Sequence, residues 1–294
     1  MKKKPLVIGF SNSFATAERF FVEILGRKYD VVREDNNPDY LIHGYFGHDY
    51  QNKPFRKKRI FYTGENERPD YFFHSHAITF DHENSSRHYR LPLYILDMYC
   101  AQWEGVANTY DYLLNKRISD PEKEYDMKTG FCTYIQSNPK SNVRNDFFNA
   151  LCQYKKVDAA GPHLNNVGFV LPRDKMHYKV DFCRKYRFNM AFENQTQPGY
   201  ITEKILNAFY SNTIPIYWGS RTSDRDFNQK SFINCHDFQY FHEVIEYIKH
   251  LDSPAGKNEY LDILTQPAFV GNRPNEFMDL DRFVDWWDTF VYEG

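Results

Sequence analysis

The polar residues of one short loop have the types and order that bind a phosphorylated, hydroxyl-rich ligand. The loop follows an apolar run, residues 188–192, and leads into a segment with helical spacing that starts at Thr202. Lys204 adds a positive charge to the first turn, where the unpaired N–H groups of a helix also favour an anion. Glu203 beside it can accept hydrogen bonds from vicinal hydroxyls, such as those of a ribose. This loop therefore predicts a binding site for such a ligand.

Arg144 is a second candidate for anion binding. It follows an apolar run, residues 131–135, and a polar loop, and it falls in the first turn of an expected helix, residues 143–154. A guanidinium is planar and always charged, which suits a diphosphate. A solvated surface charge is the alternative interpretation of Arg144 and, from the residues alone, the more frequent one.

Two acidic residues follow a third short strand. The strand, residues 60–62, ends in the polar run Thr63-Gly64-Glu65-Asn66-Glu67. A carboxylate at the carboxyl edge of a strand can act as a general base in a cleft, and either Glu65 or Glu67 fits that role. A solvated turn is the alternative.

The elements around these residues predict an α/β fold. Residues 188–192, 202–211 and 214–218 read as strand, helix and strand, the building block of a parallel sheet covered by helices. In such sheets ligands bind beyond the carboxyl ends of the strands. The first 45 residues open with a β-α-β pattern of the same kind, but they lack G-x-G-x-x-G, so no dinucleotide is assigned there.

The least patterned interval, residues 115–129, predicts a connecting loop between two domains. The expected domains are residues 1–125 and 126–276, with a last helix, residues 277–294, that packs back on the first. The further expected helices are residues 11–27, 174–186 and 242–251.

Composition excludes several classes of protein. The net charge of the 294 residues is −2, which does not call for nucleic acid or an acidic membrane surface. The five cysteines are widely spaced and lack C-x-x-C, which indicates reduced thiols in a cytoplasmic protein without a zinc site. His74 and His76 lack a third metal ligand, and no apolar run is long enough to cross a membrane. The basic cluster at residues 56–59 predicts a solvated loop, with attraction to a membrane surface as the alternative.

Several motifs together resemble the family-10 glycosyltransferases, the α-1,3/1,4-fucosyltransferases, and most closely their bacterial members. They occur in the order of the family and span residues 60 to 250: Phe61 to Glu67, Val143-Arg144-Asn145, Phe192-Glu193-Asn194, Tyr200 to Ile205, Ile214 to Gly219, Asp226-Phe227-Asn228 and His236-Asp237-Phe238. The central block, residues 192–219, is the most specific of them.

The resemblance implies a GT-B fold, with two Rossmann-like domains that face a central cleft. It implies an acceptor-binding N-terminal domain and a C-terminal domain that binds GDP-β-L-fucose, and transfer with inversion. The acceptor would be the GlcNAc or glucose of a β-galactoside-containing oligosaccharide or glycolipid, giving Lewis-type products. By position, Glu65 matches the proposed base, Arg144 and Lys204 the residues that neutralise the diphosphate, and Glu203 a ribose-binding carboxylate. Asn194 and Tyr200 match other donor-site positions.

No cofactor is expected, because positive side chains can stabilise the leaving diphosphate, and a divalent metal would at most stimulate the reaction. The expected location is the cytoplasm, with peripheral contact at the inner membrane as the alternative. Some bacterial members carry C-terminal heptad repeats and a basic tail, and the resemblance does not extend to these. Two rival functions remain: a GT-B transferase that uses another nucleotide sugar, and a non-catalytic glycan-binding protein.

Overall fold

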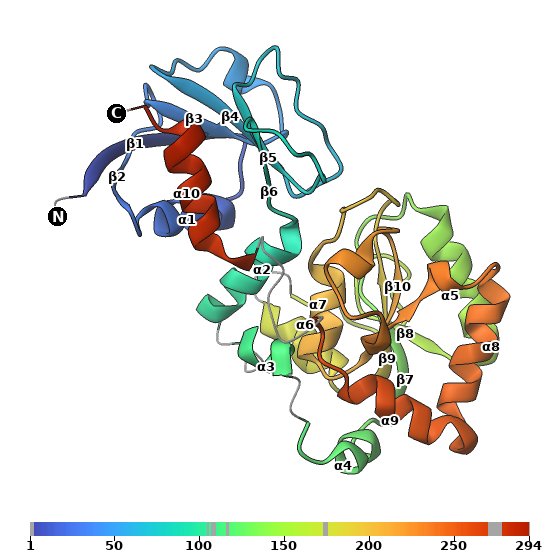
Figure 1. The fold of residues 1–294 in the computed structure, drawn as a ribbon. Helices are drawn as coiled ribbons and strands as arrows, with labels where there is room; N and C mark the ends of the chain where they lie inside the picture. The colour runs from blue at the N-terminus through green and yellow to red at the C-terminus, as the bar shows by residue number, and fades with distance from the viewer. Residues whose placement is uncertain are drawn as a thin grey trace. The chain divides into compact units, whose positions relative to one another are not determined.

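The chain folds into two compact units, each built on its own sheet of parallel strands (Figure 1). This computed structural model describes residues 3–104, 106, 110–115, 118–172, 176–269 and 278–293. Unit 1 comprises Met1–Cys100 and Pro274–Gly294, and unit 2 comprises Ala101–Arg273. The predicted α/β class, with two Rossmann-like sheets, is confirmed.

Unit 1 is built on a six-stranded sheet with the order β2-β1-β3-β4-β5-β6. The β-α-β opening is confirmed, because helix α1 (Ala15–Leu25) joins the paired strands β1 and β2 and buries Phe20, Phe21 and Ile24. The remaining elements are β1 (Lys4–Ser11), β2 (Tyr29–Arg33), β3 (Tyr40–His43), the turn η1 (Asp49–Gln51), β4 (Lys58–Tyr62), β5 (His76–Thr79), β6 (His88–Arg90) and α2 (Leu93–Ala101).

The C-terminal segment returns to unit 1. Helix α10 (Leu280–Trp286), drawn in red in Figure 1, lies beside α1 and continues as a π-helical turn, η9 (Trp287–Val291). The ring of Phe283 lies 5.9 Å from that of Phe21, and the ring of Trp287 lies 5.8 Å from that of Tyr40. The predicted last helix is thus confirmed over residues 280–291, while residue 277 lies outside the described residues.

Unit 2 is built on a five-stranded sheet with the order β11-β10-β9-β7-β8. Its strands are β7 (Gly130–Tyr134), β8 (Val157–Ala159), β9 (Tyr186–Phe192), β10 (Ile214–Trp218) and β11 (Ile233–Asn234). Its helices are α3 (Tyr110–Asn115), α4 (Pro121–Asp126), α5 (Asn142–Tyr154), α6 (Met176–Cys183), α7 (Glu203–Tyr210), α8 (Phe241–Asp252) and α9 (Lys257–Thr265), with short turns η2 (Gln102–Glu104), η3 (Ser223–Arg225), η4 (Gln229–Ser231), η5 (Cys235–Asp237) and η6 (Pro254–Gly256).

The interval expected to be a connecting loop contains helix α4 and belongs to unit 2. The carboxylate of Asp120 caps this helix by accepting the Lys123 amide at 3.0 Å, and a proline occupies its first turn. Tyr125 packs into the core of unit 2. The ammonium of Lys128 donates to two carbonyl oxygens of unit 2, at 2.6 and 3.2 Å. These contacts explain why the structural division falls at residue 100 and not at residue 125.

Candidate active site

Helix α7 begins at a buried carboxylate of the protein itself. One oxygen of Glu193 accepts hydrogen bonds from the Thr202 amide at 2.7 Å and from its hydroxyl at 2.9 Å. The other oxygen accepts one from the ammonium of Lys204 at 3.0 Å. The sequence predicted that this helix start would offer unpaired N–H groups to a ligand. That prediction is wrong for the Thr202 amide, because Glu193 already occupies it.

Glu193 has no solvent exposure, and burial raises its pKa even though the charge of Lys204 opposes the shift. Its place depends on Gly219, at the end of β10: a Cβ there would lie 2.6 Å from the Cγ of Glu193. Gly199 has a φ of +81°, which favours glycine, and its amide donates to the Ser220 hydroxyl at 2.9 Å. Two glycines therefore let the loops after β9 and β10 close around this carboxylate.

Arg144 lies in the first turn of α5, as predicted, but it is fully buried. Its guanidinium donates to the Asn194 side-chain oxygen at 2.6 Å and to the Asn138 carbonyl at 3.0 Å. Its Nε has no hydrogen-bond partner among the described residues. Burial lowers the pKa of Arg144, and the charge of Glu193 partly offsets that shift. Arg144 therefore brings a positive charge beneath the loops after β7 and β9 and fixes Asn194.

A pocket of about 160 Å³ opens at the carboxyl ends of these strands in unit 2. It is lined by Ile135, Gln136, Ser137, Asn138, Gly161, Pro162, Leu171, Lys179, Asn194, Glu203 and Lys204. Three predicted donor-site residues, Asn194, Glu203 and Lys204, thus line one pocket. The other two, Arg144 and Tyr200, are not among its lining residues, and both have no solvent exposure.

Lys179 is a pocket residue that the sequence analysis missed. It lies on α6 and makes no hydrogen bond or ion pair within the described residues, whereas Lys204 is held by Glu193 and lies 3.7 Å from Glu203. Burial opposes ionisation of Glu203, but Lys204 and Lys179 outweigh it and hold its pKa below the usual value. A carboxylate and two ammonium groups therefore share the pocket, which suits a ligand with both hydroxyls and phosphates.

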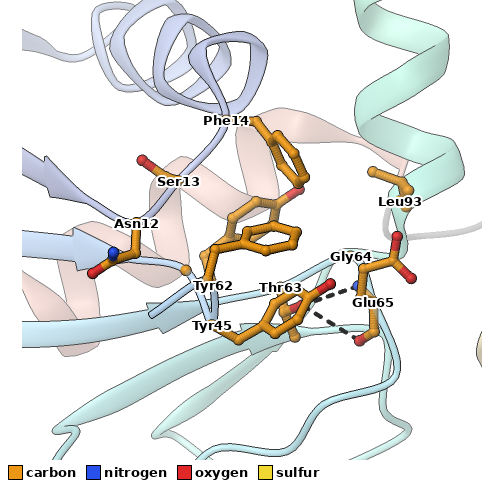
Figure 2. A pocket seen from close by; sticks show the side chains of 11 residues that line it. Asn12, Ser13, Phe14, Tyr45, Tyr62, Thr63, Gly64, Glu65 and Leu93 are labelled. Carbon is orange, nitrogen blue, oxygen red and sulfur yellow. Dashed lines mark hydrogen bonds between the residues drawn. The ribbon is translucent and has the colours of Figure 1, made fainter. Parts of the chain in front are cut away.

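In unit 1, Glu65 lies just after β4, at the carboxyl edge of the sheet as predicted. Its amide donates to the Thr63 hydroxyl at 3.0 Å, and the side chain is half-buried. Figure 2 shows its carboxylate beside Leu93, with the ring of Tyr45 directed toward the same turn. Burial, assisted by the charge of Glu65, raises the pKa of Tyr45 to about 12. Glu67, the alternative base, is exposed to solvent.

The other sequence expectations concern metals, membranes and basic residues. In the part of the chain that the structure describes, no three His, Cys, Asp or Glu side chains gather to hold a metal ion. His74 forms a hydrogen bond with His43 at 3.0 Å.

Within the described residues, no helix has the length and apolar character needed to cross a bilayer. The basic cluster is partly in β4, and Arg56 and Lys58 form ion pairs with Asp39 and Glu293 at 2.7 and 3.1 Å.

Comparison with known proteins decides the family. Residues 125–264 match the model of the glycosyltransferase family 10 (fucosyltransferase) C-terminal region, and residues 7–97 match that of the α-(1,3)-fucosyltransferase FucT N-terminal domain. The chain belongs to glycosyltransferase family 10. A crystal structure of an α1,3-fucosyltransferase with GDP-fucose has 31% identity to this family-10 chain and a TM-score of 0.80, over 100% of this chain and 92% of that one. The expected GT-B fold is thereby confirmed.

The α-(1,3)-fucosyltransferase FucT of Helicobacter pylori is 36% identical to this family-10 chain over 277 residues, which are 82% of this chain and 54% of that protein. A putative fucosyltransferase of Acanthamoeba polyphaga mimivirus is 33% identical over 54% of this chain and 26% of its own length. The chain thus spans about half the length, or less, of these curated relatives.

Proposed function

We propose that the protein is an α-1,3-fucosyltransferase. It transfers L-fucose from GDP-β-L-fucose, with inversion, to the GlcNAc or glucose of a β-galactoside-containing glycan such as N-acetyllactosamine. The observation that carries this proposal is the unit 2 pocket of a family-10 chain, where Glu203 and two lysines lie together. The similarity to an α1,3-fucosyltransferase solved with GDP-fucose supports the choice of donor.

In the proposed site, unit 2 holds the nucleotide. Glu203 accepts hydrogen bonds from the ribose hydroxyls, because its lowered pKa keeps it ionised at neutral pH. Lys204 and Lys179 bind the diphosphate. Arg144 adds its charge from beneath the pocket, through the Asn194 and Asn138 groups that it orients. Tyr200, fully buried, supports the same loop.

Inversion needs one displacement, with a base on the acceptor and stabilisation of the leaving group. The transition state has oxocarbenium character, so negative charge accumulates on the departing GDP. Preorganised positive groups stabilise that charge, and each such group is worth about 3 kcal/mol of barrier. Glu65 takes the proton of the attacking hydroxyl. We assign no metal ion to the reaction, because the lysines and Arg144 can supply the electrostatic stabilisation.

The product is a Lewis x-type linkage on a glycan destined for the cell surface, such as a lipopolysaccharide O-antigen. The enzyme works in the cytoplasm, where GDP-sugars are available, with peripheral contact at the inner membrane as an alternative location. Domain roles follow from the same proposal: unit 1 binds the acceptor through the loop that carries Glu65, and unit 2 binds the donor.

A donor panel tests this function. The purified protein is incubated with N-acetyllactosamine and GDP-fucose, GDP-mannose or UDP-galactose, and release of the nucleoside diphosphate and of the extended glycan is measured. Transfer from GDP-fucose alone is the expected result. Transfer only from another donor would contradict the proposal, and binding of the glycan with neither GDP binding nor transfer would indicate a glycan-binding protein.

A further inference from the structure

A second pocket of unit 2 lies beside β11, the edge strand of its sheet. Its lining residues come from η4, β11, η5, the helices α8 and α9 (Figure 1) and the residues that follow these elements. Its volume is about 370 Å³, against about 160 Å³ for the pocket that contains Glu203, and no described residue lines both. Small-molecule sites in proteins measure about 300–1,000 Å³, so this pocket has room for a ligand of its own.

One wall of the pocket is made by a motif to which the proposed function gives no role. Asp237 and Phe238, which belong to the family-like motif at residues 236–238, both line it. The buried side chain of Asn234 holds this wall, because its nitrogen donates to the Asp237 carboxylate at 2.9 Å and to the Gln229 side-chain oxygen at 3.1 Å. The wall is therefore ordered by bonds within the protein itself.

Two aromatic rings give the pocket flat carbon faces. The rings of Phe238 and Tyr247 are partly exposed, with centroids 5.7 Å apart and planes at 39°. The Tyr247 hydroxyl donates to the carboxylate of Glu259 at 2.6 Å, which fixes the ring. Ile263 is another partly exposed apolar residue of the lining. Such surfaces favour a ligand with an apolar face of its own.

The polar groups of the pocket select an uncharged ligand. Lys230 and Asp262 line it, and neither side chain has a hydrogen-bond or ion-pair partner in the part of the chain that the structure describes. One can donate hydrogen bonds and the other can accept them. The lining holds three carboxylates, those of Asp237, Glu259 and Asp262, which disfavour a phosphate, while the charge of Lys230 disfavours a cation.

We propose that this pocket binds a neutral saccharide. The C–H face of a pyranose ring packs on Phe238 and Tyr247, and its hydroxyls donate to Asp262 and accept from Lys230. The site goes beyond the proposed function, because it uses neither the nucleotide pocket nor Glu65. The choice of N-acetyllactosamine as the probe rests on the proposed function.

The test follows isoleucine methyl groups by nuclear magnetic resonance. The full chain, labelled with carbon-13 at these methyls, is titrated with N-acetyllactosamine. Ile263 lines this pocket and Ile135 lines the nucleotide pocket, so the two signals report the two sites separately. Asp262→Ala removes the unpaired acceptor, and Phe238→Ala removes one ring. Asp224→Ala is the matched control, because Asp224 is an exposed carboxylate of unit 2 that lines neither pocket.

We expect a saturable shift of the Ile263 methyl signal and no shift of the Ile135 signal. The dissociation constant should rise about tenfold in Asp262→Ala and in Phe238→Ala, and it should stay unchanged in Asp224→Ala. Circular dichroism establishes that each variant is folded. An unmoved Ile263 signal, an equal shift of Ile135, or an unchanged dissociation constant in both pocket variants would overturn the inference.

Fucosyl transfer to N-acetyllactosamine is measured on the same wild-type sample. Transfer without a response of Ile263 would overturn the saccharide site and leave the proposed function intact. A saturable response of Ile263 without transfer would contradict the proposed function and support the saccharide site.

Discussion

The ammonium of Lys204 lies 3.0 Å from a carboxylate oxygen of Glu193, a side chain with no solvent exposure. The same carboxylate accepts the amide and the hydroxyl of Thr202. One buried charge thus fixes both the start of α7 and the direction of a lysine that lines the pocket. Lys204 is ordered before any ligand arrives, which reduces the entropy that a phosphate would lose in ordering it.

Removal of this carboxylate should destabilise unit 2. Glu193→Ala removes the acceptor that the Thr202 amide, its hydroxyl and Lys204 share, and we expect a loss of about 2–4 kcal/mol in the free energy of unfolding. Glu193→Gln keeps an acceptor for Thr202 and should cost less. Chemical denaturation of both variants checks this order. Equal, negligible losses in the two would show that the carboxylate does not stabilise the fold.

Lys179 and Lys204 should both contribute to nucleotide binding. Each alanine substitution removes a charge-assisted hydrogen bond, so we expect GDP to bind about 10–100-fold more weakly. Isothermal titration calorimetry with GDP gives the affinities, and Lys249→Ala serves as the control, since Lys249 pairs with Glu246 on α8, away from the pocket residues. If Lys179→Ala binds GDP as the wild type does, Lys179 has no part in the donor site.

Glu65 should affect turnover and leave donor binding unchanged. Glu65→Gln removes the base and keeps the shape of the side chain, so kcat should fall by about 10²–10⁴-fold. Glu67→Gln is the matched control, because Glu67 is an exposed carboxylate in the same turn. Steady-state kinetics and GDP calorimetry are compared for both variants. An unchanged kcat in Glu65→Gln would exclude Glu65 as the base.

Unit 1 should lose stability as the pH falls below about 6.5. His43 donates through Nδ1 to the Gly44 carbonyl at 2.9 Å, so its Nε2 accepts from Nδ1 of His74 at 3.0 Å. Burial, assisted by the charge of Arg59, lowers the pKa of His43 to about 3 and that of His74 to about 4. Above the unfolded pKa of about 6.5 both states are neutral and the full stability is present.

Between the unfolded histidine pKa of about 6.5 and the lower folded pKa values, the unfolded chain binds more protons than the native one. Acid therefore favours unfolding in this range. Over this range, each of the two histidines should lower the free energy of unfolding by up to about 1.4 kcal/mol for each unit that the pH falls. His74→Phe keeps the stacking on Phe61 but removes one titrating group. The slope of the free energy of unfolding against pH should therefore fall by the contribution of about one proton. Denaturation at pH 7.5, 6.0 and 5.0 measures the slopes. Equal slopes for the variant and the wild type would show that His74 does not cause the loss of stability in acid.

The sequence predicted the elements that have a clear apolar period. Strand β10 matches its expected bounds, residues 214–218, and α7 fills residues 203–210 of the segment expected at 202–211, because the flanking turns and inward apolar positions are local features. Helix α4 was missed because it is too charged to show a period. Its capping aspartate and first-turn proline were the signals that could have identified it.

The sequence indicates which candidate site residues lie together within one segment, but it does not reveal the partners that other segments supply. Asn194, Glu203 and Lys204 lie in one segment, so their proximity is a local property. Lys179 reaches the same pocket from another helix, and the buried guanidinium of Arg144 bonds to Asn194, a residue 50 positions later in the chain. Glu193 was part of a recognised motif, but its bond to a lysine 11 residues later follows from a loop closure that one sequence does not reveal.

The most direct test of the proposed function is the structure of the product. The protein is incubated with GDP-fucose and N-acetyllactosamine, and the linkage of any new sugar is determined by nuclear magnetic resonance. The proposal predicts one equivalent of GDP per fucose transferred, with the fucose α-linked to O3 of N-acetylglucosamine. A fucose on another hydroxyl or with the β configuration, or no transfer by a folded protein that binds GDP, would contradict it.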